Sequence, residues 1–242
     1  MSKSLEGKTA LVTGASSGIG RAIARKLSKM GCKLVLAARE RKTLELVAHE
    51  LESESICVPT DLANRAQVEA LVKEAVKKFG SLDILIENAG IYTSDAFSDM
   101  TPEAMQKMID VNLTSIMVLS HAVLPYMKQQ QSGEIMVIGS IAGVADMRDE
   151  AVYSATKHAA NAFVRSLRRQ VAPDGIRVGS ILPGTVATEL WGDIDPARID
   201  QQVAEGEVLR PEDIAEIAAF MLQQPANVTI RELVVLPQAQ DI

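Results

Sequence analysis

Three glycines constrain this chain most strongly, because they lie between a short apolar run and a helical one. Residues 9–13 form the apolar run, and Gly14, Gly18 and Gly20 follow it. Gly14 permits a tight turn, Gly18 lets the backbone approach a pyrophosphate, and Gly20 lets a helix pack closely on a strand. Unpaired N–H groups at the start of that helix attract phosphate. Because a strand and a helix flank the glycines, the pattern predicts a dinucleotide-binding loop rather than a plain turn.

Strand-like and helix-like runs alternate along the rest of the chain. We expect strands at residues 9–13, 33–38, 55–58, 82–87, 134–139, 177–181 and 232–236, and helices at 17–30, 43–51, 66–79, 102–127, 153–171 and 212–222. Pro125 is expected to kink or end the longest helix. Such alternation indicates βαβ units with right-handed crossovers. The expected α/β fold is a single Rossmann-type, doubly wound parallel sheet of about seven strands, with helices on both faces and its ligand beyond the carboxyl ends of the strands.

The composition suits such a buried sheet. Hydrophobic residues make up 47% of the 242 residues and aromatic residues only 3%, so Leu, Ile, Val and Ala must build the interior. No linker or repeat divides the chain, and we expect residues 1–242 to form a single dinucleotide-binding catalytic domain. The segment around 187–208 is expected to be a lid of short helical pieces that closes over the substrate.

Charge and cysteine content narrow the class of protein. The net charge of -6 provides no basic face of the kind that nucleic acid requires. Cys32 and Cys57 lie far apart, which favours two small core residues in a reducing compartment over a disulfide. The chain starts without a leader-like apolar segment and no apolar run reaches about 18 residues, so we expect a cytoplasmic protein that does not span membranes. The three histidines are scattered singly, which predicts no catalytic metal.

The glycine loop, Thr-Gly-x-x-x-Gly-x-Gly from Thr13 to Gly20, resembles that of the short-chain dehydrogenase/reductase superfamily. Further stretches extend this resemblance over nearly the whole chain, namely Asp61-Leu62, Asn88-Ala89-Gly90, Asp110-Val111-Asn112 and Pro183-Gly184-Thr185-Val186-Ala187-Thr188. The resemblance implies a nicotinamide-dependent oxidoreductase. It also implies cofactor contacts from Gly14, Ser16, Ser17, Gly18, Ile19, Gly20, Asp61, Leu62, Asn88, Ala89, Gly90, Val111, Pro183, Gly184, Val186 and Thr188.

Some of these residues have individual roles in the family. Asp61 would accept a hydrogen bond from the adenine amino group, although Asp-Leu-Ala-Asn also suits a turn or a helix start. Gly90 would give the adenosine room. The Val186 backbone and the Thr188 hydroxyl would bind the nicotinamide carboxamide, which fixes the face of the ring that delivers hydride. Family members often carry a second Asn before the Asn-Ala-Gly motif, and we expect Glu87 to be tolerated there.

Residues at the end of the second predicted strand determine whether the chain prefers NADP or NAD as its cofactor. NAD-preferring members of the family carry an acid where this chain has Ala38. Arg39 follows, and a guanidinium can hold a 2′-phosphate with two hydrogen bonds, while Ser16 adds a hydroxyl. We therefore predict NADP as the cofactor. NAD remains the alternative, because Glu40 lies near the spacing of an NAD-type acid and Arg39 would alternatively stack on the adenine.

A tyrosine and a lysine four residues apart supply the candidate acid/base. Tyr153 and Lys157 share one face of a predicted helix. A free phenol titrates at about pH 10, and an ammonium about 4–5 Å away favours the phenolate by about 3–4 kcal/mol at an effective dielectric constant of about 20. We therefore expect the pKa of Tyr153 to be lowered toward the working pH, so that it exchanges protons with the substrate.

Two further residues complete the predicted catalytic set. Ser140 closes the fifth strand, 13 residues before Tyr153, and its hydroxyl would donate to the substrate oxygen as negative charge grows. The family resemblance adds Asn112, whose carboxamide would hold a water that relays protons to Lys157. It also implies that Lys157 holds the nicotinamide ribose. Each residue alone suits an ordinary turn or helix face, but their occurrence together behind a dinucleotide loop favours catalysis.

The substrate is less well determined by the sequence. Residues 168–172, 177–184 and 227–237 resemble ribitol dehydrogenase and its glucose/ribitol relatives, which implies a polyol, sugar or hydroxy-acid type of secondary alcohol. Those relatives carry the NAD-type acid that Ala38 replaces, and NADP would favour reduction. The alternative enzyme is a 3-oxoacyl thioester (acyl-carrier) reductase, which would require a cationic patch to bind the carrier. A non-catalytic NADP-binding protein is the alternative outside enzymes.

Two segments near the expected substrate each allow two interpretations, and two helices carry residues suited to an interface between subunits. Trp191 either lines the pocket or packs within the lid. Asp146, Met147, Arg148, Asp149 and Glu150 either bind the substrate or form a solvated loop. The helices at 105–127 and 153–171 carry small or apolar outer positions such as Ala155, Ala159 and Ala162, and related proteins pair these helices. We therefore expect a homotetramer or homodimer acting on a small-molecule alcohol or ketone.

Overall fold

One parallel sheet forms the centre of the computed structural model, which describes residues 3–93, 95–191 and 195–242. Its seven strands follow the order β3-β2-β1-β4-β5-β6-β7, and every neighbouring pair is parallel. The strands are β1 (Thr9–Thr13), β2 (Lys33–Ala38), β3 (Ser55–Pro59), β4 (Ile84–Glu87), β5 (Gly133–Ile138), β6 (Ile176–Pro183) and β7 (Glu232–Val235). This is the doubly wound α/β sheet that the alternation of runs predicts.

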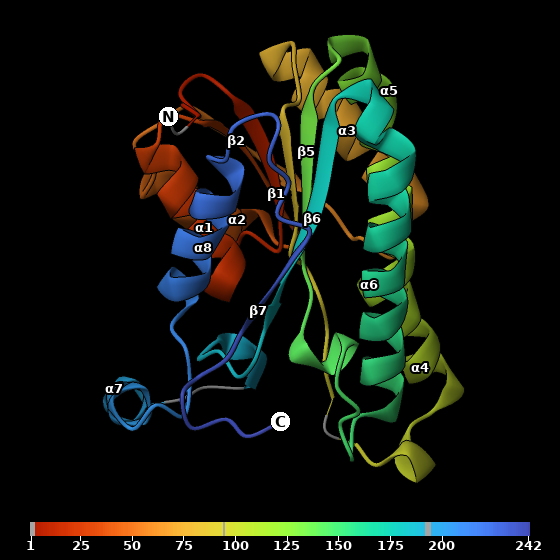
Figure 1. Cartoon of the computed structure of the whole chain (residues 1–242), viewed down its shortest axis with the longest axis vertical. Coiled ribbons are helices and arrows are strands. Elements are labelled where there is room, and N and C mark those ends of the chain that lie inside the picture. The colour runs from red at the N-terminus through yellow and green to blue at the C-terminus, as the bar shows by residue number, and fades with distance from the viewer. Residues whose placement is uncertain (1–2, 94, 192–194) are drawn as a thin grey trace.

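Helices cover both faces of the sheet (Figure 1). One face carries α1 (Gly18–Lys29), α2 (Arg41–His49) and α8 (Pro211–Leu222), and the other carries α3 (Arg65–Phe79), α5 (Ser115–Gln130) and α6 (Ala151–Val171). Two further helices, α4 (Pro102–Ile109) and α7 (Pro196–Ala204), lie near the carboxyl ends of the strands, at the bottom of Figure 1.

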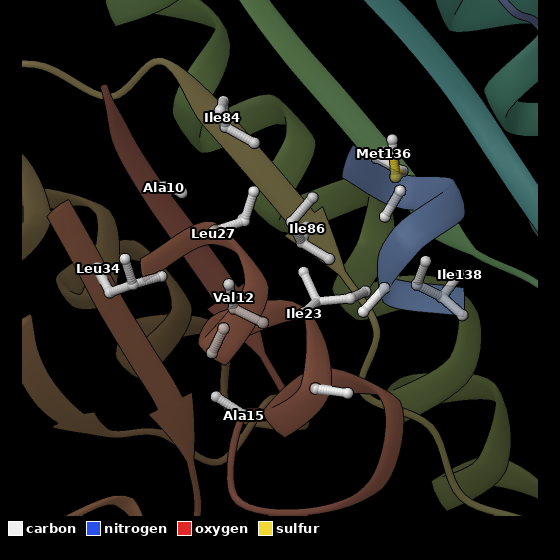
Figure 2. Packing of buried hydrophobic residues seen from close by; sticks show 14 of the residues in the cluster. Ala10, Val12, Ala15, Ile23, Leu27, Leu34, Ile84, Ile86, Met136 and Ile138 are labelled. Carbon is white, nitrogen blue, oxygen red and sulfur yellow. The ribbon is translucent and has the colours of Figure 1, made fainter. Parts of the chain in front are cut away.

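Alternating apolar side chains on the strands divide the core into two layers. Ala10 and Val12 of β1 belong to the cluster under α1, while Leu11 between them belongs to the cluster under α3 and α5. Figure 2 shows the first layer, in which Ile23 and Leu27 of α1 lie over the strands. Both of these side chains are at most 1% exposed, so they anchor the helix that follows the glycine loop.

The strand order places a crevice at the carboxyl end of β1. The chain moves from β1 outward to β2 and β3, then crosses back so that β4 lies on the other side of β1. Loops that leave β1 and β4 therefore part in opposite directions. In open parallel sheets, ligands bind at this reversal point. The fold thus brings the glycine loop and the Asn88-Ala89-Gly90 stretch to the same place.

The long helix differs from its prediction as one helix over 102–127. It contains a π-helical segment, Asp110–Thr114, between α4 and α5, and Pro125 neither ends nor interrupts it. The helix continues to Gln130 because Pro125 and His121, whose carbonyl loses its partner, both lie on the exposed side. The helix ends before Gln131, which adopts a left-handed conformation with φ 50°.

Within the described residues, the continuous stretch Pro102–Gln130 has the length and apolar composition of a membrane span. A core helix of a globular protein has the same composition. Ile116, Leu119, Val123 and Met127 are buried in the cluster that α5 shares with the sheet. Packing against the sheet therefore accounts for much of the apolar character of this stretch.

Candidate active site

A cavity of about 740 Å³ extends along the carboxyl ends of the strands. It begins beside Arg39 after β2, passes the glycine loop, and reaches the start of α6. Most of the residues singled out from the sequence line it: Gly14, Ser16, Ser17, Gly18, Ile19, Arg39, Asp61, Leu62, Asn88, Ala89, Gly90, Val111, Ser140, Tyr153, Lys157, Pro183, Gly184, Val186 and Thr188. Residues from eight separate parts of the chain thereby line one cavity.

The glycine loop fits a bound pyrophosphate. Gly14 and Gly18 have φ values of 63° and 47°, which glycine adopts without strain. A Cβ atom on Gly18 would lie 3.0 Å from the Thr188 side chain, so a larger residue would fill the space above the loop. Ser17 precedes α1 without capping it by its side chain. The first N–H groups of α1 therefore lack a cap from Ser17 and suit an anion.

Two predicted site residues lie behind the cavity wall. Gly20 packs against the Gly14 carbonyl oxygen, where a Cβ atom would overlap it and lie 2.5 Å from Asn88 Nδ2. Asn112 is fully buried in the π-helical segment, and its carboxamide is paired with the backbone of Ile91 in both directions, at 2.8 and 2.9 Å. Both residues therefore shape the wall rather than the lining.

Asn88 and Asp61 line the cavity but also have structural partners. The Asn88 amide donates to the Thr13 carbonyl at 3.1 Å, which ties β4 to the glycine loop. Asp61 accepts from the Ala63 N–H at 3.0 Å in a turn, while Asn64 caps α3. The alternative interpretation of Asp61 as a turn residue thus describes part of its role, and its exposed carboxylate still faces the cavity.

Ser140, Tyr153 and Lys157 meet at one end of the cavity. The Ser140 and Tyr153 side chains share a hydrogen bond, and Lys157 Nζ lies 5.4 Å from the centre of the Tyr153 ring. A Cβ atom on Gly143 would lie 2.9 Å from the Lys157 carbonyl oxygen, so the short turn after Ser140 packs directly on α6. This close packing holds the serine hydroxyl against the tyrosine.

The electrostatics of this cluster differ from the prediction of a lowered tyrosine pKa. Burial raises the pKa of Tyr153 to about 12, the Ser140 hydrogen bond opposes this, and the Glu150 carboxylate adds to it. Burial also lowers the pKa of Lys157 to about 8. Desolvation of both groups thus outweighs the attraction between ammonium and phenolate, and the isolated chain holds Tyr153 as a protonated acid.

Several cavity residues escaped the sequence analysis. Thr43, Thr60, Ile91, Tyr92 and Leu190 belong to this group, and so does Gln240. Tyr92 lies two residues after the motif Asn88-Ala89-Gly90, so its place near the site could have been predicted from the sequence. Gln240 could not, because the C-terminal segment reaches the site only through folding. Its side chain accepts from the Thr185 N–H at 3.0 Å. The Trp191 side chain lies outside the described structure.

Glu87, the departure from the family motif, is a buried acid on β4. It is 4% exposed, and it accepts a hydrogen bond from Ser120 Oγ at 2.6 Å. Burial raises its pKa well above the ordinary value, and the Ser120 bond opposes this only in part. A neutral carboxylic acid can stay in the interior without an ion pair. This explains how the fold accommodates an acid next to Asn88.

The raised pKa of Glu87 predicts a pH-dependent stability. As pH rises above about 4.3, the unfolded chain loses a proton that the folded chain keeps, so the free energy of unfolding falls until the folded pKa is reached. Glu87→Gln removes this term. We expect the variant to gain more than about 1 kcal/mol at pH 8 relative to pH 5, measured by urea unfolding at both values. Glu74→Gln, at an exposed position on α3, should show no such difference.

Comparisons with known proteins agree with this geometry. Residues 8–199 match the short chain dehydrogenase family. An uncharacterised oxidoreductase of Staphylococcus aureus (strain USA300) is 39% identical over 234 residues, which cover 96% of this chain and 98% of the relative. The 3-ketoacyl-(acyl-carrier-protein) reductase of Brucella melitensis, solved with NADH, superposes with a TM-score of 0.87 at 32% identity and covers 96% of this chain and 98% of its own.

An archaeal structure extends these comparisons to the second nicotinamide cofactor. The alcohol dehydrogenase of Thermococcus sibiricus, solved with 5-hydroxy-NADP, superposes with a TM-score of 0.86 at 31% identity and covers 97% of this chain and 98% of its own. The family match covers residues 8–199, and the three relatives each cover nearly the full length of this chain and of their own. This chain belongs to the short-chain dehydrogenase/reductase family, and it is a nicotinamide-dependent oxidoreductase that acts on CH–OH groups.

Proposed function

We propose that this chain is an NADP-dependent oxidoreductase that transfers hydride between nicotinamide and a secondary alcohol or ketone, with Tyr153 as the acid/base. One observation carries the proposal: a continuous cavity joins Arg39 and the glycine loop to the hydrogen-bonded pair of Ser140 and Tyr153. A phosphate-binding end and a proton-exchanging end in one space are what hydride transfer to a carbonyl requires.

The chain's own residues divide the binding of the dinucleotide. The N–H groups at the start of α1 would hold the pyrophosphate, Asp61 would hold the adenine, and Lys157 would hold the nicotinamide ribose. Val186 and Thr188 follow β6 and would bind the carboxamide. When bound, the nicotinamide supplies or accepts the hydride. The tight fit at Gly18, beneath Thr188, supports a cradle of this shape.

Proton transfer belongs to Tyr153 and its neighbours. With a pKa of about 12, Tyr153 is a proton donor at neutral pH, as ketone reduction needs. The Ser140 hydroxyl would donate to the same substrate oxygen as negative charge develops on it. Asn112 Oδ1 and Lys157 Nζ both approach Gly90, at 3.4 and 3.7 Å from an ideal Cβ position, which supports the family's proton relay at that point. The relay water itself remains a prediction.

Arg39 supports NADP over NAD. It is exposed at the cavity edge and forms no ion pair with any other described residue, so its guanidinium is available to a 2′-phosphate. Ser16, Thr43 and Thr60 add hydroxyls at the same end. Glu40, the rival NAD-type acid, also lines the cavity, but it is exposed and directly precedes α2. The solved relatives include both an NADH and an NADP-type complex.

Reversing the charge at Arg39 tests the cofactor assignment. We expect Arg39→Asp to raise the KM for NADPH at least about tenfold, because a charge-assisted hydrogen bond contributes about 1.5–3 kcal/mol. The KM for NADH should change little or fall. Arg41→Asp is the matched control, since Arg41 is ion-paired with Glu45 and does not line the cavity. An unchanged KM for NADPH in Arg39→Asp would show that the assignment is wrong.

Two substrate classes compete within this reaction. The resemblance to ribitol and glucose dehydrogenases favours a polyol, sugar or hydroxy-acid type of alcohol. The likeness to the Brucella reductase favours a 3-oxoacyl thioester. Acidic side chains at the cavity, Glu40, Glu150 and Glu189, weaken the second choice, because an acidic carrier would meet them. A non-catalytic NADP-binding protein would not need Ser140 hydrogen-bonded to Tyr153.

The remaining features of the proposal concern assembly, the lid and location. Ala155 and Ala162 of α6 are exposed, which supports pairing of this helix in a homodimer or homotetramer. The segment around 187–208 is proposed as a lid, of which residues 192–194 lie outside the described residues. Glu189 at its start forms an ion pair of 3.4 Å with Arg21 of α1, which supports closure over the glycine loop. We propose the cytoplasm as the location of the protein.

A further inference from the structure

A second tyrosine and a carboxylate lie beside Tyr153 at the substrate end of the cavity. The rings of Tyr92 and Tyr153 meet edge to face, with centroids 5.2 Å apart and planes at 89°. Glu150 directly precedes α6 and accepts a hydrogen bond from the Tyr92 hydroxyl. All three residues line the cavity. Tyr92 therefore contacts the candidate acid/base with its ring and holds a carboxylate with its hydroxyl.

Glu150 differs from its acidic neighbours in the same loop. Asp146 and Asp149 are exposed and do not line the cavity, whereas Glu150 is half-buried and does. Burial raises the pKa of Tyr92 to about 12, and the Glu150 charge adds to this, so Tyr92 remains a neutral donor to the carboxylate. In the loop from Asp146 to Glu150, Met147 and Glu150 therefore line the cavity, and Glu150 is the one acidic residue of the loop that does so.

Among the described residues, no lysine or arginine forms an ion pair with Glu150. Lys107 of α4 is exposed at the cavity edge and Lys157 lies beyond the Tyr153 ring, while Glu189 lies near Gly18 and is ion-paired with Arg21. An ionised carboxylate only accepts hydrogen bonds. A substrate group beside the reacting carbon would therefore meet an acceptor with a negative charge.

We propose that Glu150 determines substrate specificity, by accepting a hydrogen bond from a hydroxyl or ammonium group near the reacting carbon and by disfavouring a carboxylate there. Tyr92 is the residue that positions it. This inference rests on the proposed oxidoreductase function and narrows its substrate class: neutral polyols, sugars and amino alcohols fit, and hydroxy acids do not. Unpaired like charges in a partly buried site are strongly disfavoured.

A matched set of ketones tests the proposal with NADPH as reductant. 2-Butanone, 4-hydroxy-2-butanone, 4-amino-2-butanone and acetoacetate share one methyl ketone unit and differ in the terminal group, which a methylene separates from the carbonyl carbon. For the wild type, we expect kcat/KM to be highest for the hydroxyl or the ammonium compound and lowest for acetoacetate. Taken as a ratio to 2-butanone in the same variant, kcat/KM in Glu150→Gln should rise about tenfold for acetoacetate and fall for the ammonium compound.

Two further variants test whether the specificity depends on Glu150 itself or only on the overall negative charge of the loop. Asp149→Asn removes the same charge one residue away and should leave the order of the four ketones unchanged. Tyr92→Phe keeps the ring contact but frees Glu150, so discrimination against acetoacetate should weaken in part. Equal use of acetoacetate and 4-hydroxy-2-butanone by the wild type, or an unchanged order in Glu150→Gln, would overturn the proposal.

A tyrosine titration without cofactor tests the position of Glu150 independently of catalysis. The measurement uses a Tyr126→Phe background, which leaves only Tyr92 and Tyr153 to titrate. Because the Glu150 charge disfavours both phenolates, Glu150→Gln in this background should lower the pH at which tyrosinate absorbance begins to rise, and Asp149→Asn should do so much less. The same onset in Glu150→Gln and in its Tyr126→Phe parent would contradict this placement. Reduction of none of the four ketones by the wild type would instead count against the proposed function, so the two failures are distinguishable.

Discussion

Tyr153→Phe should lower kcat for ketone reduction at least about 100-fold, because general acid catalysis by a positioned side chain contributes about 10²–10⁴. The substitution removes the hydroxyl that hydrogen-bonds Ser140 and leaves the ring in its edge-to-face contact with Tyr92. The measurement is the rate of NADPH oxidation at saturating ketone. Loss of one proton donor leaves the rest of the cavity intact, so the effect should fall on kcat rather than on cofactor binding.

Two controls accompany this variant. NADPH affinity, measured by nucleotide fluorescence, should stay within about twofold of the wild type, since binding does not use the phenol proton. Tyr126→Phe alters a tyrosine of α5 outside the cavity and should leave kcat unchanged. If Tyr153→Phe kept more than about a tenth of the wild-type kcat while binding NADPH normally, the acid/base assignment would have to be abandoned.

Gly20→Ala should weaken NADPH binding at least about 100-fold, equivalent to about 2.7 kcal/mol. The backbone at Gly20 is ordinary for any residue, so the cost is entirely one of contact. A Cβ atom there would overlap the Gly14 carbonyl oxygen and crowd Asn88 Nδ2, and backbone atoms cannot give way without shifting the loop. The shift would move the start of α1 away from the pyrophosphate position. Fluorescence titration with NADPH measures the loss.

The matched control for this variant is Gly80→Ala. Gly80 ends α3 with φ 78°, has open space around its Cβ position, and lies outside the cavity. Its substitution should cost about 1–2 kcal/mol of stability through the left-handed backbone and leave NADPH affinity unchanged. NADPH binding by Gly20→Ala at wild-type strength would mean that the glycine loop does not hold the pyrophosphate.

Local patterns made most of the fold predictable from the sequence. β1 and β2 begin and end at the predicted residues, because their apolar runs are bounded sharply by glycines and charged residues. The glycine loop follows for the same reason, since its strand, turn and helix are contiguous in sequence. The order of the sheet could also be expected, because βαβ units have a fixed hand and the crevice lies where the order reverses.

Features that depend on distant contacts were not predictable. The π-helical segment Asp110–Thr114 contains Asn112, whose carboxamide pairs with Ile91 from the loop after β4. No local pattern around Asn112 indicates that partner. Gln240 reaches Thr185 only because the C-terminal segment folds back over the end of β6. Such contacts join parts of the chain that the sequence leaves far apart.

The electrostatic prediction for Tyr153 shows the same limit. Spacing alone indicates that Lys157 shares a helix face with Tyr153, and an attraction between their charged forms follows from it. Burial is a property of the folded chain. Lys157 is 6% exposed, and desolvation acts on both groups before their attraction does. Glu150 is a further case, because the sequence left open whether residues 146–150 bind the substrate or form a solvated loop, and only the fold shows that Met147 and Glu150 line the cavity.

A crystal structure of the chain with NADP and an unreactive ketone would test the central claim most directly. We predict that the ketone oxygen lies within about 2.6–3.2 Å of the Tyr153 hydroxyl, with Ser140 as its second donor and its carbonyl carbon about 3–3.5 Å from the nicotinamide C4. A complex in which NADP occupies the cavity while the Tyr153 hydroxyl points away from the ketone oxygen would contradict the account.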